Sequence, residues 1–240
     1  MRLFLRNIVL FIIPLLLINL WFYSIVYSLY LKNYEDVALN YKTYMLADSR
    51  GTPLLKTDSL NSFYNFSAGS DSYEDMERKL NFLIASSSIE RLIITVDDHT
   101  LSKYRETKNN NDRSIYFKKA NSFNNLYGMF KDKYLNRFFP LLSPKGRDII
   151  KVYFSKKEKG KERKKWINFS ESERIESCKI RVAYQFPDEE KSKILTQSLQ
   201  RIITLCMDNN IKLYGLKLPL AKELLEIQGD KSYGADFFFC

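Results

Sequence analysis

The chain has 240 residues, and its 38 Lys and Arg residues against 28 Asp and Glu residues leave a formal net charge of +10. Once an apolar segment near the amino terminus is set aside, about 200 residues remain, the size of one ordinary domain with its own core. The three cysteines and the single histidine show neither the spacing of a metal site nor an even disulfide framework. The composition therefore excludes a small disulfide-stabilised fold, and we expect no metal and no cofactor.

Residues 7–31 carry no charge and consist mainly of large aliphatic and aromatic residues. At about 1.5 Å per residue, such a helix crosses a hydrocarbon core of about 30 Å, so the segment is predicted to be a transmembrane anchor. It lacks the small residues of a signal-peptide cleavage site, which indicates an uncleaved anchor. Arg2 and Arg6 precede it, so the tail 1–6 is expected in the cytoplasm. Residues 32–240 would then lie outside the cytoplasmic (inner) membrane, as in a single-pass type II protein.

Strands and a helix alternate after the anchor. Residues 41–47 and 63–66 are predicted strands, each followed by small polar residues, and residues 57–61 between them are predicted to form a helical turn. Residues 72–86 repeat apolar positions with the helical period, and residues 91–96 form a short β-branched run typical of a buried strand. A strand, helix, strand order at this spacing predicts a parallel sheet with right-handed crossovers.

The middle of the soluble part has a weaker pattern. Residues 101–176 are rich in Asn, Lys, Phe and Tyr, with helices expected around 116–135 and after Pro144. We interpret this region as an insertion beside the sheet, within the same extracytoplasmic domain 32–240.

The regular pattern resumes near the carboxyl end with a helix over 187–209, a strand over 211–216 and a short helix over 221–227. Cys206 falls on the apolar side of the first helix, so a buried thiol is expected there. A disulfide between Cys178 and Cys240 stays open as an alternative. The predicted fold class is α/β: a three-layer, flavodoxin-like parallel sheet after an amino-terminal transmembrane helix.

Much of the positive charge lies in residues 156–165, which contain seven basic residues. The simplest interpretation is a solvated loop or helix end. The alternatives are contact with anionic lipid headgroups or with an anionic envelope polymer. Nucleic acid is disfavoured as a partner, because the segment is expected outside the cell and no aromatic residues alternate with the charges.

Three predicted strands end in small or polar residues: Asp48-Ser49-Arg50, then residues 65–70, then Asp97-Asp98-His99. The carboxyl ends of parallel strands meet at one edge of a sheet, where open α/β folds keep their chemistry. A serine directly after a strand and before Gly51 and Pro53 is typical of an exposed nucleophile. The plain alternative is a surface turn, since these residue types are ordinary turn formers.

In this order of blocks the chain resembles the SGNH, or GDSL-type, hydrolase superfamily, in particular its membrane-anchored branch related to alginate O-acetylation and lipoteichoic acid D-alanylation proteins. Ala47-Asp48-Ser49 matches the Gly-Asp-Ser block with Ala for Gly, and residues 65–69 match the glycine block. The resemblance implies that Ser49, within the block that holds Asp48, is the nucleophile. It also implies that Gly69 donates to an oxyanion, with Asn65 and Asp98 beside the substrate.

This resemblance implies a serine esterase or O-acyltransferase of the cell envelope. The substrate would be a small O-acyl group on an envelope glycan, and a membrane-bound acyltransferase is an expected partner beside the lipid bilayer. The rival hypotheses are a non-catalytic domain that binds glycan or docks onto the acyltransferase, and an unrelated anchored α/β domain without a site.

Two departures from the family pattern bear on activity. The third block has Asp97-Asp98 where the family has an Asn donor, and an ionised carboxylate cannot donate a hydrogen bond. No Asp-x-x-His block occurs, and the only histidine is His99, which either replaces the missing base or is a polar loop residue. The apolar ending at residues 237–240 favours a chain cut before the missing block. We therefore expect little or no esterase activity from the chain as given.

Overall fold

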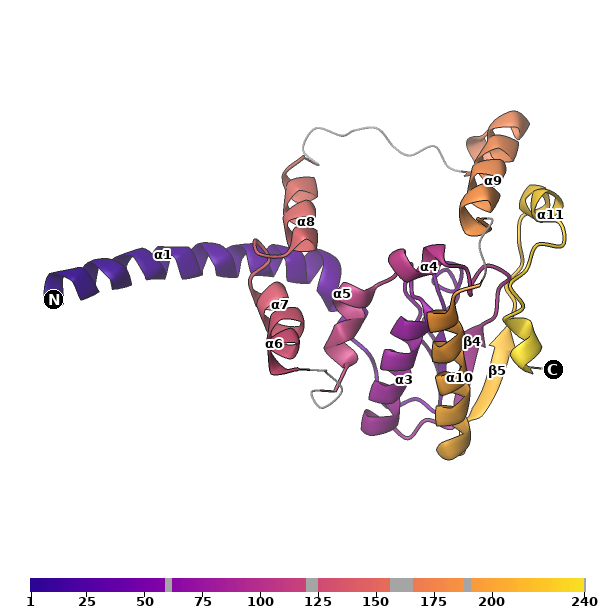
Figure 1. Ribbon diagram of the computed structural model, residues 1–240, viewed down its shortest axis with the longest axis horizontal. Coiled ribbons are helices and arrows are strands. Elements are labelled where there is room, and N and C mark those ends of the chain that lie inside the picture. The colour runs from indigo at the N-terminus through magenta and orange to yellow at the C-terminus, as the bar shows by residue number, and fades with distance from the viewer. Residues whose placement is uncertain (59–61, 120–124, 156–165, 188–190, 240) are drawn as a thin grey trace. The chain divides into compact units, whose positions relative to one another are not determined.

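The computed structural model describes residues 1–58, 62–119, 125–155, 166–187 and 191–239 (Figure 1). The chain divides into two compact units. The helical unit comprises Met1–Asp36 and Lys119–Glu162, and the sheet unit comprises Val37–Lys118 and Arg163–Cys240. The predicted catalytic strand ends and the predicted anchor therefore belong to different units.

A five-stranded sheet in the order β2-β3-β1-β4-β5 forms the centre of the sheet unit. Its strands are β1 (Thr43–Leu46), β2 (Thr57–Asp58), β3 (Phe63–Asn65), β4 (Arg91–Thr95) and β5 (Lys212–Leu216). The strands β3, β1, β4 and β5 are parallel, and only the short β2 is antiparallel to its neighbour. In the register of the sheet, Met45 lies opposite Asn65 on one side and Ile93 on the other. The predicted α/β class and parallel sheet are confirmed.

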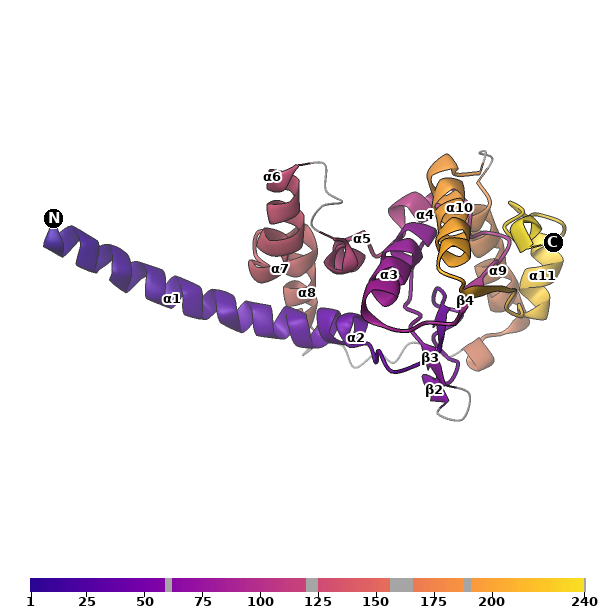
Figure 2. The same cartoon turned by 90° about the horizontal axis from the view of Figure 1, so that it is seen from below.

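Two helices, α3 (Tyr73–Ser86) and α10 (Lys193–Asp208), lie side by side over one face of the sheet (Figures 1 and 2). Helix α3 begins at a capping box, in which Ser72 and Asp75 satisfy each other's backbone N–H groups. The core between these helices and the sheet consists of large apolar side chains: Tyr44, Leu46, Met76, Leu80, Leu83, Leu92, Ile94, Leu195, Leu199 and Ile202. Cys206 is buried there as predicted, and burial raises the pKa of its thiol to about 12.

Strand residues alternate between the two faces of the sheet. Thr43, Phe63, Ile93 and Tyr214 therefore point away from these helices, and they line a groove of about 550 Å³. The three-layer arrangement stays a prediction, because the described elements place α3 and α10 on one face only.

The rest of the sheet unit consists of short elements and one long helix, α9 (Glu171–Gln185). The short elements are α4 (Tyr104–Thr107), α5 (Asn111–Ser114), the 3₁₀ turns η2 (Ile115–Phe117), η6 (Trp166–Asn168) and η7 (Asp236–Phe239), and α11 (Lys222–Gln228). Helices α9 and α11 pack on each other through a cluster of Cys178, Val182, Phe186 and Leu224. Cys178 is a free thiol, and Cys240, its alternative disulfide partner, lies outside the described residues.

The helical unit is built on α1 (Arg2–Val26), which continues through the π-helical turn η1 (Tyr27–Leu31) into α2 (Lys32–Glu35). This is one helix long and apolar enough to cross a membrane, with Pro14 inside it. The predicted span is thus supported by length and composition, while its orientation stays a prediction. The remaining elements of the unit are α6 (Leu126–Met129), η4 (Phe130–Leu135), α7 (Asn136–Phe138) and α8 (Pro144–Ser155).

Helices α7 and α8 both pack against α1, so the structure divides the predicted insertion 101–176 differently. Residues 119–162 group with the helix predicted as anchor, and only the flanking parts belong to the sheet unit. The physical reason is apolar packing: Ile150 of α8 forms a buried cluster with Val26 and Leu31. The amide of Asn19 also donates to the carbonyl oxygen of Phe138 at 2.8 Å.

Candidate functional site

The turn after β1 holds Ser49 at its exposed tip. The buried carboxylate of Asp48 accepts a hydrogen bond from the backbone N–H of Arg50 at 2.9 Å, and the N–H of Gly51 donates to the carbonyl oxygen of Asp48 at 3.1 Å. A Cβ added at Gly51 would lie 2.4 Å from the Cβ of Ala47. A methyl group at this position would therefore force the turn to shift, which favours glycine after Ser49 and Arg50.

Asn65, predicted beside the substrate, joins this turn to the loop after β3. Its amide nitrogen donates to the carbonyl oxygen of Gly51 at 2.8 Å, and its amide oxygen accepts from the N–H of Ser67 at 3.1 Å. Both ends of the buried side chain are thus bonded to backbone. In this structure Asn65 positions the two loops relative to each other.

Ser49 and Gly69 lie next to each other, as the parallel order of β1 and β3 predicts. A Cβ added at Gly69 would be 3.9 Å from the Cβ of Ser49, an ordinary van der Waals contact. The carbonyl oxygen of Gly69 accepts from the side-chain amide of Asn110 at 2.7 Å. Among the described residues, no backbone carbonyl oxygen accepts a hydrogen bond from the N–H group of Ser49 or Gly69. Two backbone donors therefore remain beside the serine.

A buried ion pair supports the loop that carries Gly69. The Nζ atom of Lys79 lies 2.6 Å from Asp71, and both side chains are fully buried. Lys79 also donates to the carbonyl oxygen of Phe66 at 2.8 Å, and Asn110 donates to the second oxygen of Asp71 at 2.7 Å. Burial raises the pKa of Asp71 and lowers the pKa of Lys79, and the attraction between the two groups opposes both shifts. The pair thus fixes the start of α3 to the end of β3.

His99 is buried beside the turn, with Asp48 and Arg50 as its partners. Its Nε2 atom is 3.4 Å from Oδ2 of Asp48, and Nη2 of Arg50 donates to its Nδ1 atom. These contacts fit a neutral ring, protonated on Nε2, whose Nδ1 atom accepts from Arg50. In the part of the chain that the structure describes, no hydrogen bond joins His99 to the hydroxyl of Ser49.

The environment of His99 favours its neutral form. Burial, together with the nearby guanidinium of Arg50, lowers the pKa of the imidazole to about 4, although Asp48 pulls the pKa upward. Burial also acts to raise the pKa of Asp48. The hydrogen bond from His99 and the charge of Arg105 outweigh that effect and hold this pKa well below its usual range. The site thus combines an ionised Asp48 with an uncharged His99 at neutral pH.

The two acidic residues after β4 diverge. Asp97 is buried, and its Oδ1 atom accepts from the N–H of Leu218 at 3.0 Å and lies 3.4 Å from Arg50. Burial raises the pKa of Asp97. Asp98 instead accepts from Lys217 at 2.6 Å and from the amide of Gln228 at 2.9 Å. The carboxylate expected beside Ser49 at this block is therefore held by the carboxyl-terminal part of the chain.

Burial acts to raise the pKa of Asp98 as well. The hydrogen bonds from Lys217, Ser232 and Gln228 outweigh it and lower this pKa.

Three site residues were assigned no role from the sequence: Arg50, Arg105 and Asn110. Arg105 donates to the carbonyl oxygen of Asp71 and lies 4.0 Å from Oδ2 of Asp48. Arg105 and Asn110 sit in the region with the weakest periodicity, so no local signal indicated them. Arg50 was visible as the neighbour of Ser49, but its pairing with His99 is a contact across 49 positions of the chain.

Among the described residues, no group of three or more His, Cys, Asp and Glu side chains is arranged to hold a metal ion. Comparison of the chain with protein-family models, with curated proteins and with solved structures found no match. The likeness to the SGNH superfamily accordingly depends on the short blocks at the strand ends.

Proposed function

We propose that the sheet unit is an SGNH-like acyl-transfer domain held at a membrane by α1. The observation that carries this proposal is the closeness of Ser49 and Gly69 at the carboxyl ends of β1 and β3, where a Cβ at Gly69 would lie 3.9 Å from the Cβ of Ser49. In this proposal the domain is a three-layer fold outside the cytoplasmic membrane. Its ancestral reaction is hydrolysis or transfer of a small O-acyl group on an envelope glycan.

Each group has a defined part in the proposed chemistry. The hydroxyl oxygen of Ser49 attacks the acyl carbonyl, and its proton leaves to a base. The N–H groups of Ser49 and Gly69 stabilise the oxyanion that forms. The substrate alcohol then departs with a proton, and water or an acceptor sugar releases the acyl group from Ser49. Asn65 and the pair of Lys79 with Asp71 keep the two donor loops in place.

The base is the weak part of this site. The chain's only histidine has its ring nitrogens beside Arg50 and Asp48, and its lowered pKa makes it a poor proton acceptor. General-base assistance typically contributes about 10² to 10⁴ in rate. We therefore propose that acylation of Ser49 is slow and that turnover is slower still, because release of the acyl group also needs a base.

The pairing of His99 with Arg50 favours a second candidate function. The ring nitrogens of His99 contact Arg50 and Asp48 and are not directed to Ser49, which suits a site that binds a ligand without turnover. The domain would then hold an acylated glycan, or dock onto a membrane acyltransferase, with Ser49 as a contact residue.

Acylation and turnover are separable by experiment. The full chain in detergent is incubated with a short-chain aryl acetate, and hydrolysis is followed in the parent, Ser49→Ala and His99→Ala. We expect a rate near background in all three. Peptide mass spectrometry should nevertheless find acetate on Ser49 of the parent, in excess of that on other exposed serines.

The outcomes of this experiment distinguish the acyl-transfer domain from the binding domain. Fast hydrolysis abolished by both substitutions would make His99 the base and contradict the slow-site proposal. Ser49 acetylated no more than other exposed serines would remove the acyl-transfer function and favour the binding domain.

A further inference from the structure

A groove runs between α8 and the end of the long apolar helix, entirely within the helical unit. Its volume is about 750 Å³, and its walls include Trp21, Leu29, Val152 and Phe154 together with the charged Lys145 and Asp148. Half of the surface of Trp21, Val152 and Phe154 is exposed, at 53%, 53% and 50%. The groove therefore presents a largely apolar wall that the described protein leaves uncovered.

The charged and apolar parts of the groove are separated along α8. Lys145, Asp148 and Val152 follow the i, i+3, i+7 spacing of one helix face. The two charges lie in the first turns of the helix and the apolar side chains in its last turns. A ligand that fills the groove is thus amphiphilic, with a polar end beside Lys145 and an apolar end beside Phe154.

The direction of α8 matches the orientation of a lipid. The ring of Phe154 lies 5.9 Å from the ring of Trp21, and Lys145 lies 5.3 Å over the ring of Tyr30. Trp21 is nearer the centre of the apolar helix than Tyr30. In a membrane crossed by this helix, the apolar end of the groove would therefore lie nearer the hydrocarbon and the charged end nearer the headgroups.

The charge of Lys145 favours an anionic headgroup. Lys145 and Asp148 are the charged residues among those that line the groove, and Lys145 lies 5.3 Å over the ring of Tyr30. Basic pockets beside membrane helices attract anionic lipid headgroups. Asp148 adds an acceptor, which suits a headgroup that also carries hydroxyl donors.

We propose that this groove binds one anionic glycerophospholipid of the leaflet that surrounds it. The phosphodiester accepts a hydrogen bond from Lys145, and a headgroup hydroxyl donates to Asp148. One acyl chain lies along Val152, Phe154 and Trp21. The inference concerns the helical unit alone and does not depend on the chemistry at Ser49.

Trp21 makes the groove directly observable. The chain has two tryptophans, so Trp166→Phe leaves Trp21 as the only one. This full-length background is reconstituted in phosphatidylcholine vesicles that contain a minor fraction of lipid brominated on an acyl chain, either phosphatidylglycerol or phosphatidylcholine. Bromine quenches a tryptophan that it contacts. We expect brominated phosphatidylglycerol to occupy the groove about fivefold better than phosphatidylcholine, the effect of one basic residue near an anionic lipid.

Matched variants of α8 test the specific contact. Lys145→Glu should abolish the excess quenching, and Lys145→Arg should retain it. Lys151→Glu is the control, because it makes the same charge change on the same helix but does not line the groove.

Two results would overturn the proposal. Equal quenching by the two brominated lipids would show that the groove does not select an anionic lipid. It would favour a protein partner or a second copy of the chain as the occupant. If Lys145→Glu and Lys151→Glu reduced the excess quenching by brominated phosphatidylglycerol equally, diffuse surface charge rather than the groove would explain it.

Discussion

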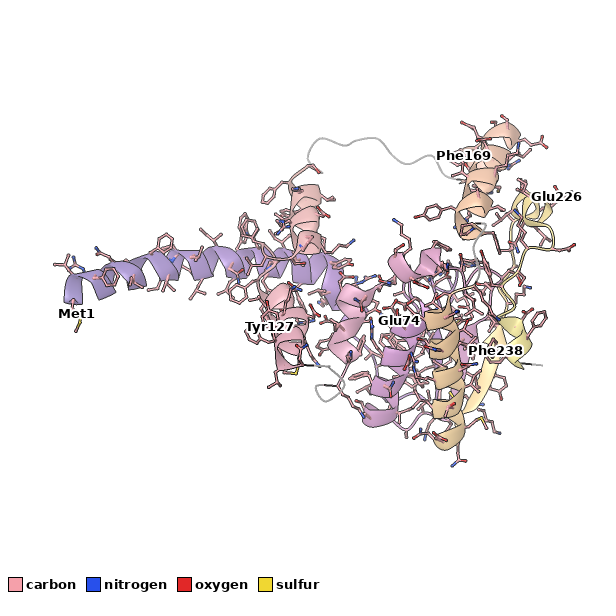
Figure 3. The ribbon with its side chains drawn as sticks, viewed as in Figure 1. Met1, Glu74, Tyr127, Phe169, Glu226 and Phe238 are labelled. Carbon is pink, nitrogen blue, oxygen red and sulfur yellow. The ribbon has the colours of Figure 1, made fainter. Side chains whose placement is uncertain are left out.

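The sheet unit and the helical unit place their polar and apolar side chains in opposite ways. In the sheet unit, Lys79 and Asp71 are fully buried as an ion pair under the loop of Gly69. In the helical unit, Leu10 and Leu17 of α1 are each 61% exposed. Figure 3 shows the side chains of α1 extending away from the ribbon along most of its length.

This difference teaches that the two units are suited to different solvents. A charge is stable inside a protein only when a partner and hydrogen bonds replace its water. A helix that exposes large apolar side chains all round is stable where the surroundings are themselves apolar. The sheet unit therefore keeps a paired, hydrogen-bonded charge beneath its site, and α1 is the part of the helical unit that is suited to apolar surroundings such as a bilayer.

The largest effect is expected when the buried ion pair of Lys79 and Asp71 in the sheet unit is broken. Lys79→Met leaves Asp71 buried without its counter-charge, and we expect the free energy of unfolding to fall by about 3–5 kcal/mol. Urea denaturation of the full chain in detergent measures this, with Trp166 as the reporter in a Trp21→Phe background. Lys212→Met is the matched control, because this lysine is exposed on β5 and its loss should change stability by less than about 0.5 kcal/mol. Equal losses in the two variants would contradict the structural role of the pair.

The second largest effect is a dependence of stability on pH that arises from His99. It tests how thoroughly the site of the sheet unit is shielded from water. Because the pKa of His99 is lowered to about 4 in the folded state, the unfolded chain binds a proton first as the pH falls. The contribution of His99 to stability is therefore complete above about pH 6.5 and is lost between about pH 6.5 and 4. The loss amounts to at most about 3 kcal/mol.

NMR measures this pKa directly, since His99 is the only histidine of the chain and a tag without histidine keeps it so. The imidazole signal should titrate near pH 4. The variant His99→Gln should also flatten the dependence of stability on pH in this window. A signal that titrates at the ordinary pKa of about 6.5 would show that the ring is hydrated.

The smallest effect is the difference in stability expected between alanine substitutions at two glycines near Ser49, Gly51 and Gly69. Gly51→Ala places a methyl group 2.4 Å from the Cβ of Ala47 and should cost about 1–3 kcal/mol. Gly69→Ala meets only the Cβ of Ser49 at 3.9 Å, so its stability should change by less than about 1 kcal/mol. Urea midpoints of the two variants provide the comparison. A larger loss in Gly69→Ala would show that the loop after β3 is the tighter of the two.

Local patterns predicted the elements of the sheet unit well. The short β-branched run before Val96 is β4, and the helix predicted over 72–86 is α3, which begins at the capping box of Ser72 and Asp75. The approach of Ser49 to Gly69 was also predictable, because parallel strands bring their carboxyl ends to one edge. The helical turn expected over 57–61 was wrong in its first two residues, which form β2, and its other residues lie outside the described part. Pairing with β3 outweighed local preference there.

The partners within the site were not predictable in the same way. His99, expected either to act as a base or to lie in a loop, is paired with Arg50 and Asp48, and Asp98 is paired with Lys217. Each of these contacts joins residues far apart in the chain, so no spacing in the sequence indicates it.

The sequence by itself determined the apolar helix, the parallel α/β sheet and the serine at a strand end, because hydrophobic period and turn chemistry act over a few residues. Only the tertiary structure decided that residues 119–162 belong with α1 and that Arg50 donates a hydrogen bond to the ring of His99. The physical reason is that apolar faces and buried charges are satisfied by whichever partner the fold brings within reach. That choice depends on contacts between distant segments rather than on local preference.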